Sequence, residues 1–305
     1  MEILVLDHYA AGYEPYLRDL TDSVGYATEP TGLASRCDVL LAQPDFAATY
    51  LREGGQVDWI QSTWAGVRPL AEEPVSRYSV VTGVKSVFGP QIAEYVFTYA
   101  LEEIRRPASL RAAQADQRWI PELPGTLADR HMLVVGTGDI GRHVAMVGAA
   151  FGLRVTGVSR SGTPVAGFER VLPVTGLSEA VADADYVVLV LPDTEATAGL
   201  INADVFAAMA CKPLLFNVGR GNSLDDEALL QALSNGTVRG AVLDVFDEEP
   251  LPPAHPLWSA PAVTITPHVA AVSFPRDIAR LFLANLKKYK AGQPLDFVLD
   301  LARGY

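Results

Sequence analysis

Short apolar runs alternate with helical patterns along almost the whole chain. In the first third, the runs that predict strands are Ile3–Leu6, Val39–Ala42, Trp59–Gln61 and Ser79–Val81. A second set comprises Met132–Val135, Val155–Val158, Tyr186–Leu191, Leu214–Val218, Gly240–Leu243 and Val263–Thr266. Short strands that alternate with amphipathic helices are typical of βα units, whose strands are parallel. The pattern therefore predicts an α/β protein with parallel sheets.

Two long helical patterns divide the chain into domains. One runs from Gly89 to Arg106, and the other starts after Ser273 and stops at Gly292. The block between them has the strands of a nearly complete doubly wound sheet, whereas the last helix has no strand of its own there. We therefore expect two Rossmann-like doubly wound domains: a substrate domain from residues 1–102 and 273–305, and a dinucleotide-binding domain from residues 103–272. Because ligands of such folds bind outside the carboxyl ends of the strands, the active site is expected in the cleft between the domains.

Composition narrows the classes of partner. The 305 residues are 49% hydrophobic and carry a formal net charge of −12. A protein this acidic repels phosphate backbones and anionic lipids, so nucleic acid and membrane surfaces are not expected as partners. Apolar runs such as Val187–Leu191 are too short to span a bilayer, and the N-terminal residues indicate a strand rather than a signal peptide. Cys37 and Cys211 lack metal-ligand spacing, which favours reduced thiols in a cytoplasmic protein with no metal site.

The sequence GTGDIG, Gly136–Gly141, has the pattern of a dinucleotide-binding turn. Glycine-rich turns of this kind are common, but this one follows an apolar strand and opens an amphipathic helix, which is the context that gives the pattern its meaning. Gly136 would allow the tight turn, Gly138 would let the backbone approach a pyrophosphate, and Gly141 would let the helix pack on the strand. The helix amides would then bind the phosphates.

The second strand of this unit runs into Ser159, Arg160 and Ser161, where NAD-binding units usually carry an acidic residue. A carboxylate there would bind the ribose hydroxyls and repel a 2′-phosphate, whereas an arginine flanked by hydroxyls attracts that phosphate. The plain alternative is an exposed loop arginine. The position at the end of the second strand favours binding of NADP(H) over NAD(H).

Charged side chains stand at the ends of three later strands. Arg220 lies between two glycines, Asp244 ends a strand whose continuation supplies Glu249, and His268 ends the last strand. Because the carboxyl ends of parallel strands share one edge of a sheet, these groups can converge. Taken singly, each has a plain alternative: a turn-capping arginine, a solvated acid and a buried structural histidine.

Taken together, these motifs resemble the D-isomer-specific 2-hydroxyacid dehydrogenase family over the whole chain. The order Arg, Glu, His is accompanied by the segments LPDTEATAGLIN, FNVGRG, LDVFDEEPL, HPLW and TPHVAA. The resemblance is strongest to the NADPH-using glyoxylate/hydroxypyruvate reductase branch, which shares the SRS ending and a loop like STWAGV, Ser62–Val67.

The resemblance implies a role for each matching residue. Arg220 would bind the substrate carboxylate and polarise the carbonyl oxygen, and His268 would protonate that oxygen as hydride arrives from the nicotinamide. Glu249 would orient His268 and favour its protonated form. The backbone amides of Ala65 and Gly66 would bind the substrate carboxylate.

The remaining implied contacts concern the pocket wall and the cofactor. Trp64 would wall the substrate pocket, although a packing role suits a half-exposed tryptophan equally well. Asp244 would meet the carboxamide of the nicotinamide. The further cofactor contacts implied by the resemblance are Thr137, Asp139, Ile140, Leu191, Pro192, Thr197, Val218, Gly219 and Ala270.

The expected activity is NADPH-dependent reduction of a small 2-ketoacid to the D-2-hydroxyacid by a homodimer. Formate dehydrogenases share the fold but carry Gln at the position of Glu249. Two alternatives stay open: another 2-hydroxyacid dehydrogenase such as phosphoglycerate dehydrogenase, and a dinucleotide-sensing corepressor that keeps the fold and the triad. The identity of the physiological ketoacid also stays open, because small apolar pocket walls discriminate by only about 1–3 kcal/mol.

Overall fold

The computed structural model describes residues 1–71, 80–121 and 124–300, and it divides into two compact units. The first combines Met1–Val87 with the chain from Ser273 onwards, and the second is Phe88–Val272. Ser79, the first residue of one predicted strand, lies outside the described residues.

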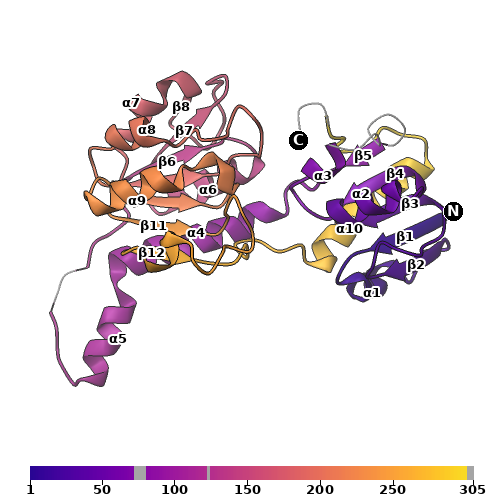
Figure 1. Cartoon of the computed structure of the whole chain (residues 1–305), viewed down its shortest axis with the longest axis horizontal. Coiled ribbons are helices and arrows are strands. Elements are labelled where there is room, and N and C mark those ends of the chain that lie inside the picture. The colour runs from indigo at the N-terminus through magenta and orange to yellow at the C-terminus, as the bar shows by residue number, and fades with distance from the viewer. Residues whose placement is uncertain (72–79, 122–123, 301–305) are drawn as a thin grey trace. The chain divides into compact units, whose positions relative to one another are not determined.

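The first unit contains a five-stranded sheet in which every strand pairing is parallel (Figure 1). Its order is β2-β1-β3-β4-β5, the order of flavodoxin-like doubly wound sheets. The strands are β1 Glu2–Leu6, β2 Ser23–Ala27, β3 Arg36–Ala42, β4 Gln56–Ser62 and β5 Val80–Thr82. Its α-helices are α1 Glu14–Leu17, α2 Pro44–Arg52, α3 Arg68–Ala71 and α10 Pro275–Lys290.

The last helix packs on the sheet of this first unit. The ring of Phe282 stacks on Trp59 of β4 with 5.4 Å between ring centroids, and Tyr289 lies against the same indole. Ile278 and Leu286 are buried on the same side of α10. The apolar side of α10 therefore packs against Trp59, which lies more than two hundred positions earlier in the chain.

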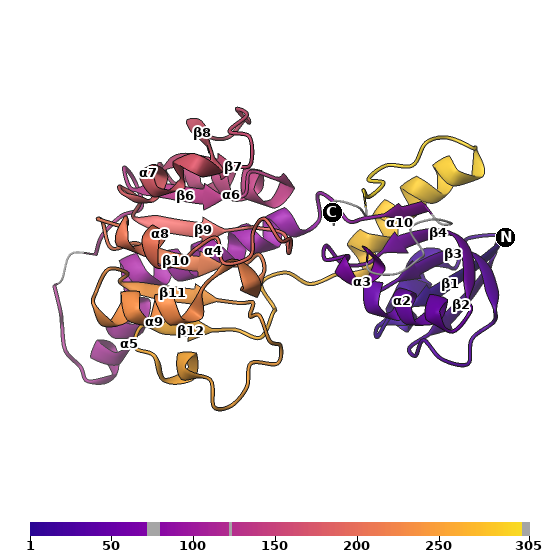
Figure 2. The same ribbon diagram turned by 45° about the horizontal axis from the view of Figure 1, so that its top comes forward.

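The second unit contains a seven-stranded, all-parallel sheet in the order β12-β11-β10-β9-β6-β7-β8 (Figure 2). The strands are β6 His131–Val135, β7 Arg154–Ser159, β8 Arg170–Pro173, β9 Tyr186–Leu189, β10 Leu214–Asn217, β11 Gly240–Leu243 and β12 Val263–Ile265. The strand order reverses between β6 and β9, the point at which dinucleotides bind in Rossmann sheets. The predicted fold class, α/β with two Rossmann-like parallel sheets, is confirmed.

Successive residues of the central strands enter different apolar layers. Leu133 and Val135 of β6 belong to one buried cluster, and Met132 and Val134 belong to the other. The second cluster also contains the buried face of α4 Phe88–Arg105 and of α6 Asp139–Ala150, whereas the first contains residues of α7 Leu177–Val181, α8 Ala203–Ala207 and α9 Asp226–Ser234. Burial on both faces explains why the strands are continuous apolar runs.

Two strands have no counterpart in the prediction from sequence. β2 and β8 both lie at an edge of their sheet, and most of their residues are exposed or half-buried. Because edge strands bury little side-chain surface, they show no apolar run. Three strands end one or two residues before their predicted ends. Leu191, Val218 and Thr266, which were predicted to be the last strand residues, lie in the loops that follow β9, β10 and β12.

The unit boundary near the first long helix also differs from the predicted division at residues 102 and 103. All of α4 groups with the second unit, whereas the division at Val272 and Ser273 coincides with the predicted one. The reason lies in the buried face of α4: Ile92, Val96 and Ala100 pack in the same cluster as Val144 of α6.

Two glycines of the β6–α6 turn are required by close packing. A Cβ atom on Gly141 would lie 1.9 Å from the carbonyl oxygen of Gly136, and Gly136 itself adopts a φ of +111°. A Cβ atom on Gly138 would instead enter open space, with no heavy atom within 4 Å. The turn is therefore sterically closed at its two ends and open at its centre.

This difference predicts opposite effects on stability. Gly141→Ala should lower the free energy of unfolding by at least about 2 kcal/mol, because neither backbone segment can retreat. Gly138→Ala, the matched control, should cost less than about 1 kcal/mol, the value of replacing an N-cap glycine. Urea unfolding measures both, and equal losses in the two variants would contradict the packing argument.

Candidate active site

The loop after β10 holds Arg220 against two other segments. A Cβ atom on Gly219 would lie 2.5 Å from the Leu191 amide nitrogen, and one on Gly221 would lie 1.8 Å from the carbonyl carbon of Phe246. Asn217 Nδ2 and Ser223 Oγ donate to the Arg220 carbonyl oxygen at 3.1 and 2.8 Å. The two glycines thus let the loop lie directly on the segments after β9 and β11, and the two side chains fix its backbone.

The guanidinium of Arg220 is half-buried at this edge of the sheet. Its Nη1 donates to the Gly219 carbonyl oxygen at 2.6 Å. Burial lowers the pKa of Arg220, and the nearby charges of Glu249 and Asp193 oppose that effect. Since arginine does not lose its proton in proteins, the group remains a cation that can bind a carboxylate in forked geometry.

Glu249 lies on the loop after β11 and is tied to that loop. Its Oε1 accepts from the Phe246 amide at 2.9 Å, and its Oε2 lies 2.7 Å from His268 Nδ1. Burial raises the pKa of Glu249, but the His268 hydrogen bond, the Phe246 amide and the charges of His268 and Arg220 outweigh burial, so the pKa is lowered overall. Glu249 is therefore a carboxylate at neutral pH.

His268 follows β12 in an uncommon backbone conformation. Its φ is 55°, in the left-handed region, and its amide donates to the Asp244 carbonyl oxygen at 2.9 Å. Because a carboxylate can only accept, Nδ1 carries the proton shared with Glu249, and Nε2 is the nitrogen that remains for a substrate. The side chain as a whole is 43% exposed.

Asp244 is buried beneath His268 and is 2% exposed. Its Oδ1 accepts from Thr266 Oγ1 at 2.5 Å and from the Val269 amide at 2.9 Å, and its Oδ2 accepts from the Ala270 amide at 2.9 Å. A carboxylate has about four acceptor positions, so three are used internally and one is left for a ligand. The three hydrogen bonds of Asp244 therefore stabilise the conformation of the segment around His268.

The structure therefore brings Arg220, Glu249 and His268 together at the carboxyl ends of β10, β11 and β12. The arrangement combines an anion-binding cation with an acid/base pair, which can bind a carboxylate and exchange a proton with a neighbouring oxygen. Among residues 1–71, 80–121 and 124–300, no cluster of His, Cys, Asp and Glu could hold a metal ion.

The glycine-rich turn lies at the same edge of the sheet, after β6. Gly138 is the N-cap of α6, and it has no side chain that could cap the helix. Thr137 packs closely on the next strand, because a Cβ atom on Gly157 would lie 2.5 Å from its Cγ2. The N-terminal end of α6 and the open space at Gly138 fit the pyrophosphate of a dinucleotide.

The loop after β7 folds on its own hydroxyl groups. Ser159 Oγ accepts from the Gly162 amide at 3.1 Å, and Ser161 Oγ lies 2.7 Å from Thr163 Oγ1. Arg160 and Ser161 are exposed and Ser159 is half-buried. Each serine hydroxyl can still serve a further partner, since a hydroxyl has one donor and two acceptor positions.

The other predicted cofactor residues occupy the ends of neighbouring strands. Leu191 and Pro192 follow β9, Val218 and Gly219 follow β10, and Ala270 is buried after His268. Thr197 Oγ1 donates to the Pro192 carbonyl oxygen at 2.7 Å, which closes the loop that contains both. Of these positions, those after β9 lie beside the point where the strand order reverses, whereas Ala270 follows the edge strand β12.

The three predicted substrate residues Trp64, Ala65 and Gly66 belong to the first unit, after β4. Ser62 Oγ accepts from the Trp64 amide at 3.1 Å, and Ser273 Oγ donates to the Thr63 carbonyl oxygen at 2.5 Å. The Trp64 side chain is 43% exposed. The loop is thus held by hydroxyl groups on both sides and presents an aromatic surface to solvent.

Two polar residues near His268 were not identified from the sequence. Thr266 and Tyr95 form a hydrogen-bonded pair at 2.6 Å, and Thr266 continues to Asp244. Tyr95 stands within an apolar helical pattern, where a tyrosine is indistinguishable from a packing aromatic residue. In the part of the chain that the structure describes, no helix is both long and apolar enough to cross a membrane.

Known proteins share this architecture. The family model described as "D-isomer specific 2-hydroxyacid dehydrogenase, NAD binding domain" matches residues 97–270. Glyoxylate/hydroxypyruvate reductase A of Serratia proteamaculans is 38% identical over 218 residues, which cover 70% of this chain and 69% of the relative.

Solved structures are similar over nearly the whole chain. A D-isomer specific 2-hydroxyacid dehydrogenase family protein of Aeromonas salmonicida gives a TM-score of 0.90 at 38% identity, covering 98% of this chain and 99% of its own. The NADPH-dependent glyoxylate/hydroxypyruvate reductase of Sinorhizobium meliloti, in complex with NADP and sulfate, gives 0.86 at 27% identity, covering 100% and 99%. The chain belongs to the D-isomer-specific 2-hydroxyacid dehydrogenase family.

Proposed function

We propose that the protein reduces a small 2-ketoacid such as glyoxylate or hydroxypyruvate to the D-2-hydroxyacid, with NADPH as the hydride donor. The observation that carries the proposal is the Glu249–His268 pair at 2.7 Å with Arg220 at the same sheet edge. A carbonyl reduction needs one proton at the oxygen, and His268 Nε2 would supply it because Nδ1 is bonded to Glu249.

The residues divide the work as follows. Arg220 binds the substrate carboxylate and polarises the carbonyl oxygen. Glu249 accepts the hydrogen bond from His268 Nδ1 and stabilises the imidazolium. A bound nicotinamide would supply hydride for the carbonyl carbon, and His268 would protonate the carbonyl oxygen.

The cofactor proposal rests on the second unit. The amides at Gly138, Asp139 and Ile140 would bind the pyrophosphate, and the residues after β9, β10 and β12 would line the nicotinamide side. Asp244 would offer its remaining acceptor position to the carboxamide. The Sinorhizobium meliloti relative and a Xanthobacter autotrophicus relative, 28% identical, are complexes with NADP and NADPH, which supports the same cofactor here.

Preference for NADPH would come from Ser159, Arg160 and Ser161. The exposed guanidinium can form a charge-assisted pair with the 2′-phosphate, and both hydroxyl groups can add hydrogen bonds. No carboxylate stands at these three positions to repel that phosphate.

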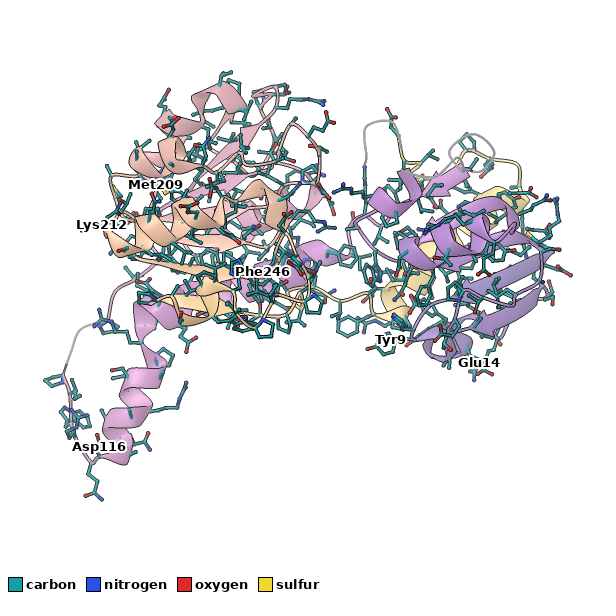
Figure 3. All side chains as sticks on the ribbon, viewed as in Figure 1. Tyr9, Glu14, Asp116, Met209, Lys212 and Phe246 are labelled. Carbon is teal, nitrogen blue, oxygen red and sulfur yellow. The ribbon has the colours of Figure 1, made fainter. Side chains whose placement is uncertain are left out.

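We further propose that the protein is a homodimer, and that a second copy covers α5 Pro107–Ala115. This helix projects from the rest of the second unit, with Asp116 at its end (Figures 1 and 3). Only Ala113 of α5 is buried, whereas Leu110 is 47% and Trp119 is 94% exposed. Isolated helices shorter than about 12–15 residues are marginal in water, so a helix of this length needs a partner surface.

The activity is tested by oxidation of NADPH on addition of glyoxylate or hydroxypyruvate. Wild-type protein should turn over, and His268→Ala should lower kcat by roughly 10²–10⁴-fold, because the positioned proton donor is lost. Glu249→Gln should shift the decline of activity to lower pH, because the imidazolium loses its anionic partner. Cofactor binding without turnover of any 2-ketoacid would contradict the proposal and favour a binding protein.

The role of Arg160 is tested by cofactor preference. Arg160→Ala should raise KM for NADPH by roughly 10–150-fold and leave KM for NADH nearly unchanged, because only NADPH carries the 2′-phosphate. Ser159→Asp should shift preference towards NADH. An equal loss with both cofactors would make Arg160 a structural loop residue.

The oligomer is tested by light scattering after gel filtration. Wild-type protein should elute with twice the chain mass of 32.7 kDa, and Trp119→Asp should elute as a monomer, because a charge opposes burial of this position. Tyr9→Asp, at a 73% exposed aromatic position of the first unit, is the control and should remain dimeric. A monomeric wild type would refute the proposed dimer.

A further inference from the structure

The segment Thr266–Val272, which contains His268, is hydrogen-bonded at both ends to residues of α4. Gln91 Nε2 of α4 donates to the Val272 carbonyl oxygen at 3.0 Å, and Gln91 Oε1 accepts from the Val272 amide at 3.0 Å. Tyr95, four residues further along α4, bonds to Thr266 at 2.6 Å. Residues four apart lie on one face of a helix, so α4 presents both contacts side by side.

The direction of the hydrogen bonds at the Thr266 end follows from proton counting. Thr266 has one hydroxyl proton, and it is donated to Asp244 Oδ1 at 2.5 Å. Tyr95 must therefore donate to Thr266. Burial raises the pKa of Tyr95 above its ordinary value, so the phenol keeps the proton that this donation needs.

The chain of donors ends at the backbone of the acid/base residue. Asp244 accepts from the amides of Val269 and Ala270, and its carbonyl oxygen accepts from the His268 amide at 2.9 Å. These bonds hold His268 at its φ of 55°, a conformation that is uncommon for a residue other than glycine and persists only when its surroundings impose it.

We propose that Tyr95 is a positioning residue for the acid/base His268, acting through Thr266 and Asp244; the inference rests on the proposed reductase function. Tyr95 touches neither the reacting atoms nor Glu249. Its hydroxyl fixes Thr266, Thr266 fixes one oxygen of Asp244, and Asp244 fixes the backbone that aims His268 Nε2. Gln91 keeps the segment attached to α4 when the hydroxyl is removed, so the loss should be one of position rather than of folding.

The test is Tyr95→Phe, which removes the hydroxyl group alone. We expect kcat for ketoacid reduction to fall roughly 3- to 10-fold, the worth of one hydrogen bond. KM for the ketoacid should change by less than about two-fold, since the variant leaves Arg220, the proposed carboxylate-binding residue, untouched. With NADPH deuterated at the transferred position, the isotope effect on kcat should rise, because the chemical step becomes slower.

Two further variants sharpen the kinetic test. Thr266→Val should reproduce the effect of Tyr95→Phe, and the double variant should be no worse than the more impaired single one, because both break one chain. Tyr186→Phe is the matched control: Tyr186 is fully buried in the same unit, but its hydroxyl bonds to Glu103 at the opposite end of the sheet. It should keep the wild-type kcat and isotope effect. If Tyr95→Phe behaves like Tyr186→Phe, the inference is wrong.

Hydrogen–deuterium exchange separates this inference from the proposed activity. The peptide that covers residues 266–272 should exchange faster in Tyr95→Phe than in wild type or Tyr186→Phe, because the amides of Val269 and Ala270 are held less firmly. This result would support the positioning chain even if no ketoacid were reduced. Unchanged exchange in an active enzyme would overturn the chain and leave the reductase function intact.

Discussion

The hydrogen bond between Glu249 and His268 is the interaction on which the rest of the site depends. It decides which imidazole nitrogen carries the shared proton and therefore which nitrogen faces a substrate. A partly buried carboxylate would by itself be easier to protonate, but the Phe246 amide, His268 and Arg220 hold its pKa below the ordinary value. Glu249 is therefore a carboxylate at neutral pH and can accept the hydrogen bond from His268 Nδ1.

The geometry of the pair comes from the sheet and from close backbone packing. β10, β11 and β12 are adjacent, so the residues that follow them share one edge. Gly221 lets the Arg220 loop lie directly on Phe246 and Asp247, and the same loop after β11 supplies the amide that orients Glu249 (Phe246 is labelled in Figure 3). A side chain at Gly221 would force the cation and the acid apart.

The central strands and the glycine-rich turn could be predicted from the sequence, because each is indicated by a short run of consecutive residues. Central strands are buried on both faces and appear as apolar runs, and the glycine-rich turn stands where strand becomes helix. The edge strands β2 and β8 bury little and leave no such signal. The contact of Tyr95 with Thr266 joins residues 171 positions apart, and no periodicity distinguishes such a tyrosine from one that merely packs.

Asp244 joins the proposed cofactor contact to the segment that contains His268. The family resemblance implies that it meets the nicotinamide carboxamide, and in the structure three of its acceptor positions fold the segment around His268. The two duties are compatible, because a carboxylate has about four acceptor positions. They are also coupled: a ligand that bonds to the remaining position shares a rigid carboxylate with the backbone of His268. Cofactor binding and alignment of the proton donor would then depend on the same two oxygen atoms.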